Sequence, residues 1–181
     1  MDHGESSYRR YLKGEEDAFR DIVELHFDGL LLFVHGYVRD LDAAEDIVID
    51  VFSQLVVHKN RFRFGHSLKT YLYMMARSRA LDHLKHRDKL QMTELSSDLP
   101  IADGKPGPEE ALIAEEDKKT LYRALSRLEE NQRQALHLVY FRDLTCEEAA
   151  KVLKKSRKQI YNLLYRGKEH LRTILEKEEL L

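Results

Sequence analysis

Hydrophobic residues recur every three or four positions over most of the chain, which is the spacing of one face of an α-helix. In the N-terminal half one apolar stripe covers residues 19–37, and a second covers residues 44–56 behind the capping pair Asp42 and Glu45. A third helical pattern covers residues 68–87. We therefore expect the N-terminal half to be entirely helical.

Two short helical patterns lie close together near the C-terminus, and each opens with its own capping pair. Thr145 is followed three residues later by Glu148, and Ser156 is followed three residues later by Gln159. In such a pair the hydroxyl accepts a hydrogen bond from the first turn, and the longer side chain accepts one from the capping residue. The pattern predicts a helix-turn-helix whose second helix starts near Arg157.

The second of these helices has one apolar face and one face suited to duplex DNA. Its outward face is cationic, aromatic and hydrogen-bonding, and the candidate DNA contacts are Arg157, Lys158, Tyr161, Asn162, Tyr165 and Arg166. In a helix-turn-helix this helix enters the major groove, where Arg, Lys and Asn match the donors and acceptors of base edges. A helical hairpin with a solvated basic face is the alternative.

A second basic segment, residues 59–87, contains eight Lys and Arg and a single Asp. Single-stranded DNA needs aromatic surfaces for its unstacked bases and cations for its backbone. The candidate residues for such a strand are Asn60, Arg61, Phe62, Arg63, Phe64, Ser67, Tyr71, Arg77 and Arg79. Phe62 and Tyr71 are equally compatible with a hydrophobic core.

The composition limits the class of protein. With 181 residues, 43% hydrophobic and 34% charged, the chain can form one or two small domains and is too polar for a membrane protein. Its polar N-terminus lacks a secretory signal, so we expect a cytoplasmic protein. The single cysteine, Cys146, excludes an internal disulfide and a cysteine-based zinc site.

All three prolines lie in an acidic segment without helical periodicity, residues 88–116. Its Pro, Gly and Ser residues favour turns, and an irregular segment of this length is unusual inside one compact domain. The sequence therefore predicts two small helical domains, residues 1–87 and 117–176, joined by a flexible linker.

The predicted helix over residues 44–56 carries polar side chains opposite its apolar stripe. Asp46, Asp50 and Gln54 lie on this side, and acidic residues are rarely buried. They form a surface that could bind a basic patch on another protein, and ordinary solvation is the alternative.

These stretches resemble a known family. Residues 44–52, 67–77 and 80–85 resemble domain 2 of the bacterial extracytoplasmic-function (group IV) sigma factors, and residues 125–172 are similar to their domain 4. The resemblance implies an all-α protein that serves as a promoter-specificity subunit of RNA polymerase. It also implies three partners: core RNA polymerase, promoter DNA and, in some members, an anti-sigma factor.

The resemblance further implies a role for each candidate site. The clamp helices of the largest polymerase subunit would bind Asp46, Asp50 and Gln54, while the flap of the second-largest subunit would bind the C-terminal domain. The candidates between Asn60 and Arg79 would melt the −10 element and hold a flipped base. The six candidates on the second helix of the helix-turn-helix would read the −35 element.

Five positions depart from residues common in the family. Tyr161 replaces a more usual cation, which suggests an altered base preference. Ile49 and Val57 replace a frequent Gln and Trp on the polymerase-binding helix. Asn131 replaces a Pro at a helix start, where we expect it to form a capping pair with Gln134. Lys154 replaces a Gly in the turn, so a positive φ angle there would be mildly strained.

Two other classes of function remain open from the residues alone. A stand-alone helix-turn-helix regulator would use only the C-terminal domain and would leave the acidic helix without a role. A metal-dependent hydrolase would depend on Asp82 and four histidines, and their spacing matches no common catalytic metal motif; the histidines are His26, His35, His83 and His86. We therefore expect no enzymatic activity, no cofactor, no bound metal and no membrane association.

Overall fold

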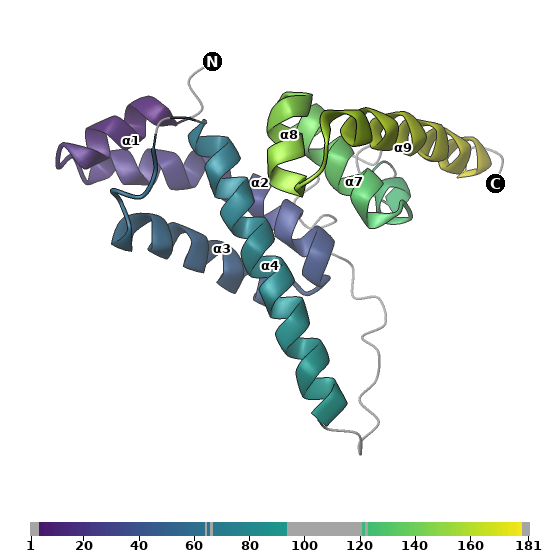
Figure 1. Ribbon diagram of the computed structural model, residues 1–181, viewed down its shortest axis with the longest axis horizontal. Helices are drawn as coiled ribbons and strands as arrows, with labels where there is room; N and C mark the ends of the chain where they lie inside the picture. The colour runs from purple at the N-terminus through teal and green to yellow at the C-terminus, as the bar shows by residue number, and fades with distance from the viewer. Residues whose placement is uncertain (1–3, 64, 66, 94–120, 122, 179–181) are drawn as a thin grey trace.

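The computed structural model describes residues 4–63, 65, 67–93, 121 and 123–178, and every regular element within these ranges is a helix (Figure 1). This agrees with the predicted all-α fold. The helices are α1 (Glu5–Leu12), α2 (Asp17–Val38), α3 (Leu41–Val57), α4 (Leu68–Thr93), α7 (Glu130–Leu136), the π-helical turn η1 (His137–Phe141), α8 (Cys146–Leu153) and α9 (Arg157–Glu178). No helix in the described ranges is long and apolar enough to cross a membrane.

The N-terminal domain is a bundle in which α2 packs against α1, α3 and α4. The predicted apolar stripes form its core, with Leu30, Val34, Val48 and Val51 each fully buried. The expected cap of α3 was wrong by two residues: Asp40, not Asp42, accepts a hydrogen bond from the backbone nitrogen of Ala43 at 2.9 Å.

Helix α1 was not predicted, although it supplies part of the core. Tyr8 is fully buried and donates a hydrogen bond from its hydroxyl to the carbonyl oxygen of Lys59 at 2.7 Å. Burial raises the pKa of this tyrosine to about 12. The contact attaches the segment after α3 to α1, and therefore positions one of the candidate DNA-binding loops.

The C-terminal domain contains the predicted helix-turn-helix. Thr145 and Glu148 form a reciprocal capping box at the start of α8, and the backbone nitrogen of Ser156 donates to Gln159 at 2.7 Å. Lys154 has a φ angle of 53° between the two helices, so the expected left-handed turn residue is present.

The expected capping pair at the start of α7 was wrong. Helix α7 begins one residue earlier than Asn131, whose side chain donates to Glu129 at 2.7 Å. Gln134 donates instead to the carbonyl oxygen of Phe33 in α2 at 3.3 Å. A tertiary hydrogen-bond partner has thus replaced the local one.

Helix α4 continues to Thr93, six residues beyond the domain boundary expected at Arg87. Residues 88–93 contain no Gly or Pro and include Lys, Leu, Gln and Met, which favour helices. The remainder of the expected linker, residues 94–116, lies outside the described residues.

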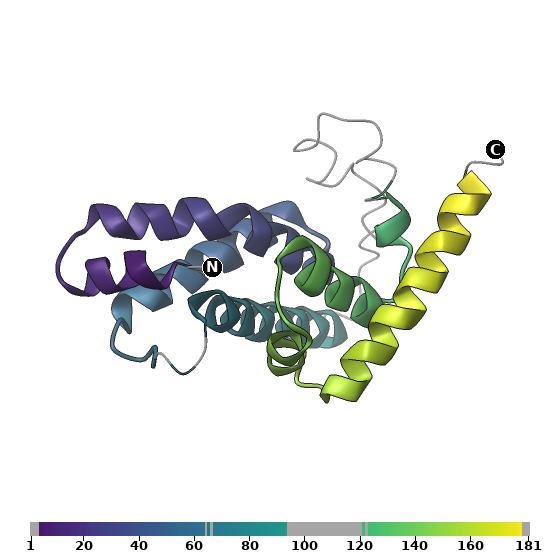
Figure 2. The ribbon, with the colours of Figure 1, turned by 90° about the horizontal axis from the view of Figure 1, so that it is seen from above.

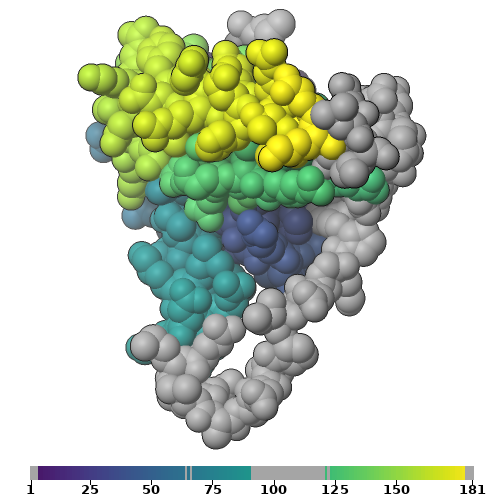
Figure 3. Space-filling view, turned by 90° about the vertical axis from the view of Figure 1, so that its right-hand side faces the viewer, coloured from purple at the N-terminus to yellow at the C-terminus, as the bar shows by residue number. Residues whose placement is uncertain are grey.

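The two domains pack directly on each other. Helix α8 contacts α4, and α7 contacts α2, so the C-terminal domain covers one side of the N-terminal bundle (Figure 2). From the side, α9 forms the outer surface, with α7 between it and the N-terminal helices (Figure 3).

Candidate nucleic-acid and polymerase interfaces

The outward face of α9 carries all six residues predicted to contact duplex DNA, and all six are exposed. Ile160 and Leu164 anchor the opposite face, where they are 0% and 5% exposed. Near the start of the helix, Arg157 donates to the hydroxyl of Tyr161 at 3.1 Å, and its guanidinium lies 5.5 Å from the centre of the tyrosine ring. The helix thus presents cations and hydrogen-bonding groups to solvent.

The candidates for single-stranded DNA divide into exposed and buried groups. Asn60, Arg61 and Arg63 are exposed in the segment between α3 and α4. Phe62 is only 5% exposed, because its ring lies 5.5 Å from that of Tyr8 and 5.3 Å from that of Tyr71. The structure therefore contradicts an exposed base-stacking role for Phe62 and makes it a core residue.

The remaining candidates from that segment lie on or next to α4, except Phe64, which lies outside the described residues. Ser67 accepts a hydrogen bond from the backbone nitrogen of Thr70 at 3.2 Å and therefore caps α4. Tyr71 and Arg77 are partly buried. Arg77 lies next to Tyr37, whose pKa is raised to about 12 by burial although the nearby arginine opposes the shift.

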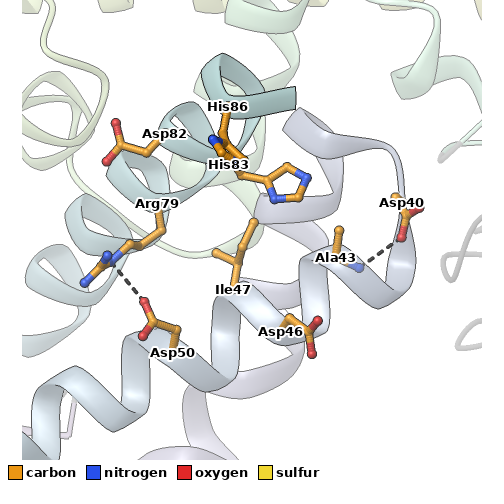
Figure 4. Close-up of a pocket in the computed structure, with 9 residues that line it drawn as sticks. All are labelled: Asp40, Ala43, Asp46, Ile47, Asp50, Arg79, Asp82, His83 and His86. Carbon is orange, nitrogen blue, oxygen red and sulfur yellow. Dashed lines mark hydrogen bonds and ion pairs between the residues drawn. The ribbon is translucent and has the colours of Figure 1, made fainter. Parts of the chain in front are cut away.

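Arg79 faces the polymerase-binding candidates rather than the DNA-binding loop. Its Nε atom pairs with Oδ2 of Asp50 at 3.0 Å across the groove between α3 and α4 (Figure 4). This open groove has a volume of about 580 Å³. Its lining residues are Asp40, Ala43, Asp46, Ile47, Asp50, Arg79, Asp82, His83 and His86.

The outer face of α3 combines acidic with apolar side chains. Asp46 is exposed, and Asp50 and Gln54 are partly exposed. The two positions that depart from the family pattern, Ile49 and Val57, are 50% and 68% exposed. Two exposed apolar side chains thus lie on the same helix as these carboxylates.

Three of the histidines considered for a hydrolase lie in two different environments. His26 is 1% exposed within the N-terminal core, whereas His83 and His86 line the open groove beside Asp82. Within the described ranges, no three His, Cys, Asp or Glu side chains lie close enough together to hold a metal ion.

Comparison with known families gives both domains a match. The family model for Sigma-70 region 2 matches residues 22–90, and the model for Sigma-70, region 4 matches residues 118–171. The chain belongs to the extracytoplasmic-function sigma factors of RNA polymerase. It is a sigma factor that directs promoter-specific initiation of transcription.

Known relatives align with nearly the whole chain. The ECF RNA polymerase sigma factor SigW of Bacillus subtilis is 26% identical over 170 residues, covering 88% of this chain and 90% of SigW. SigX of the same organism is 24% identical over 92% of this chain and 89% of its own length.

Two solved structures share the fold. The sigma factor RpoE of Bartonella quintana, solved with the anti-sigma factor NepR, has a TM-score of 0.71 at 21% identity, covering 87% of this chain and 96% of its own. CnrH, solved with the cytosolic domain of CnrY, has a TM-score of 0.65 at 16% identity, covering 97% and 99%.

Proposed function

We propose that the two domains of this sigma factor bind different parts of the transcription initiation complex. The C-terminal domain reads the −35 element, while the N-terminal domain binds core RNA polymerase and the −10 element. One observation carries this assignment: a single chain combines an exposed cationic recognition helix with an exposed acidic and apolar face on α3. A stand-alone duplex-binding regulator would not need the second surface.

The −35 contacts are assigned to the N-terminal half of α9. Asn162 and Arg166 are one helical turn apart and exposed, so both can reach base edges in one major groove. Arg157 is held by Tyr161, and we assign it with Lys158 to the phosphate backbone. Phosphate contacts fix the register of the helix, whereas base contacts supply sequence preference.

The −10 contacts are assigned to the exposed residues Asn60, Arg61 and Arg63, together with Ser67 and Tyr71 at the start of α4. Two arginines in an exposed segment can neutralise the backbone of a melted strand. Phe62 supports this segment from inside by packing on α1 and α4.

We assign the binding of core polymerase to the groove between α3 and α4 and to the outer face of α3. Asp46, Asp50 and Gln54 supply its polar part, and Ile49 and Val57 its apolar part. We assign Arg79 to this surface as well, because it pairs with Asp50. The same proposal includes an anti-sigma factor as a partner, as in the solved structure of RpoE of Bartonella quintana. It also places the chain in the cytoplasm beside RNA polymerase.

The test is reconstituted transcription with the full-length chain and bacterial core RNA polymerase. Core and chain should co-elute in gel filtration, and together they should produce transcripts that start at defined promoters, whereas neither should do so alone. Tight binding to duplex DNA without co-elution and without a promoter-dependent transcript would instead favour the stand-alone regulator.

A further inference from the structure

Two exposed side chains at the start of α9 are joined to each other. Nη2 of Arg157 donates a hydrogen bond to the hydroxyl of Tyr161 at 3.1 Å, and the guanidinium lies 5.5 Å from the centre of the tyrosine ring. The two residues are one helical turn apart, the spacing at which side chains on a helix surface meet. The arginine is therefore held in one orientation on the outward face of the helix.

The position of Arg157 favours anion binding over helix stability. The N-terminus of a helix carries a partial positive charge, so Arg157 and Lys158 in the first turn of α9 oppose the helix dipole. Lys154 and Lys155 precede them in the turn and add further positive charge. A backbone phosphate bound at this end would relieve the repulsion.

The ring of Tyr161 is not needed to attach α9 to its domain. Ile160 and Leu164 form the buried side of this part of the helix, whereas Tyr161 remains 49% exposed with Arg157 beside it. The ring lies on the same outward face as Asn162, in the half of the helix that contacts base edges in a helix-turn-helix. DNA is thus the surface that would cover it.

A ring at this position selects a different base from a cation. Arginine or lysine, the more usual kind of residue here in the family, would bond O6 and N7 of guanine. Tyrosine carries no positive charge, and its hydroxyl oxygen already accepts a hydrogen bond from Arg157. The apolar group that the major groove offers to a ring is the C5-methyl of thymine. Replacing the cation by a ring therefore moves the preference from guanine to thymine.

We propose that Tyr161 has two separate roles at the −35 element: its ring contacts the C5-methyl of a thymine, and its hydroxyl holds Arg157 against a neighbouring phosphate. This inference rests on the proposed assignment of α9 to the −35 element. The ring supplies sequence preference, whereas the held arginine strengthens binding to every sequence. An arginine that is already oriented loses less side-chain entropy when it binds.

The test uses the full chain with core RNA polymerase on a promoter from which the wild-type chain initiates. In a set of duplexes, each thymine of the upstream element is replaced in turn by deoxyuridine, which removes only the methyl group. One of these replacements should weaken binding of the wild type about fourfold, the effect of exposing one buried methyl-sized group. At the same base pair, 5-methylcytosine should retain more affinity than cytosine, because it restores the methyl.

Three variants separate the two roles. Tyr161→Phe keeps the ring and loses the hydroxyl, so it should weaken binding to all duplexes by one common factor, roughly twofold to tenfold, and keep the sensitivity to deoxyuridine. Tyr161→Ala should lose both the sensitivity and the hold on Arg157. Tyr161→Arg should lose the sensitivity and favour guanine at that base pair.

The matched control is Tyr140→Phe in η1. It removes the hydroxyl of another tyrosine, which is 53% exposed, and keeps the ring that lies 5.7 Å from Nζ of Lys168. This variant should bind every duplex as the wild type does. Circular dichroism should show wild-type helicity in all four variants, because each replaced side chain is exposed.

Two results would overturn the thymine contact: equal binding of the wild type to the thymine and all deoxyuridine duplexes, or an undiminished sensitivity in Tyr161→Ala. Wild-type affinity of Tyr161→Phe for every duplex would overturn the hold on Arg157. If the wild-type chain supports no promoter-specific transcription, the proposed function fails instead. Duplexes that the chain alone selects from a random library would then decide the thymine contact by the same replacements.

Discussion

Acidification should weaken the packing between the two domains through His137. This histidine lies in η1, where its Nε2 atom is 3.3 Å from the carbonyl oxygen of Gly29, and its ring lies 5.9 Å from that of Phe33 and 6.5 Å from that of Tyr73. Burial beneath the N-terminal domain, reinforced by the charge of Arg142, lowers its pKa to about 3. Opening the domains exposes the ring and returns the pKa towards its usual value near 6.5.

The sign and size of the effect follow from this difference. Above about pH 7.5 the ring is neutral in both states, so His137 adds no pH dependence. Below it, the open or unfolded state binds a proton that the closed state excludes, and closed-state stability falls as the pH falls. Between pH 7.5 and 5.5 the loss is about 1.4 kcal/mol, or about tenfold in the equilibrium. The pKa of His35, which lies near Arg133, is also lowered by burial and gives the same sign.

The assay is chemical denaturation and scattering of the full chain at several values between about pH 7.5 and pH 5.5, for wild type and His137→Phe. The ring of His137 also stacks on that of Phe141 at 6.1 Å. Phenylalanine keeps the ring contacts with Phe33 and Phe141 but cannot take up a proton. Between pH 7.5 and 5.5 wild type should lose about 1.4 kcal/mol more than the variant. If both lose the same amount of stability, His137 is not kept neutral by the packing between the two domains and the reasoning fails.

Three further predictions concern the proposed surfaces. Arg166→Ala should weaken binding to the −35 element by about 1 to 3 kcal/mol and change the preference at one base pair. Lys158→Ala should weaken binding to all sequences alike. Binding assays over a set of promoter variants check both, and a contact whose variant does not follow this pattern is misassigned. Asp46→Lys should reduce retention of folded protein on immobilised core polymerase, and Asp28→Lys on α2 should not; equal retention would remove the α3 face from the mechanism. Phe62→Ala should lower the free energy of unfolding by about 3 kcal/mol because the ring is buried, and an unchanged thermal transition would mean that it is not part of the core.

Local chemistry determined most of the elements that the sequence predicted. The capping pairs Thr145 with Glu148 and Ser156 with Gln159 act within one helical turn, so their residue spacing is sufficient to place α8 and the start of α9. The exposed face of α9 likewise follows from helical periodicity alone. The apolar stripe of the helix faces the core, so the opposite face is left to solvent.

Tertiary packing decided what those same residues do. From the sequence, Phe62 is equally compatible with stacking on a base and with a place in the core. Only its packing against Tyr8 in α1, more than fifty positions earlier, shows that it is a core residue. The sequence predicted that Glu148 forms a capping pair with its neighbour Thr145. Its other carboxylate oxygen, however, accepts hydrogen bonds from Ser67 and Thr70, about eighty positions away. Helical periodicity and capping are determined by residues three or four positions apart. Burial and the second partner of a carboxylate depend instead on which surfaces pack together, and no short sequence pattern encodes that packing.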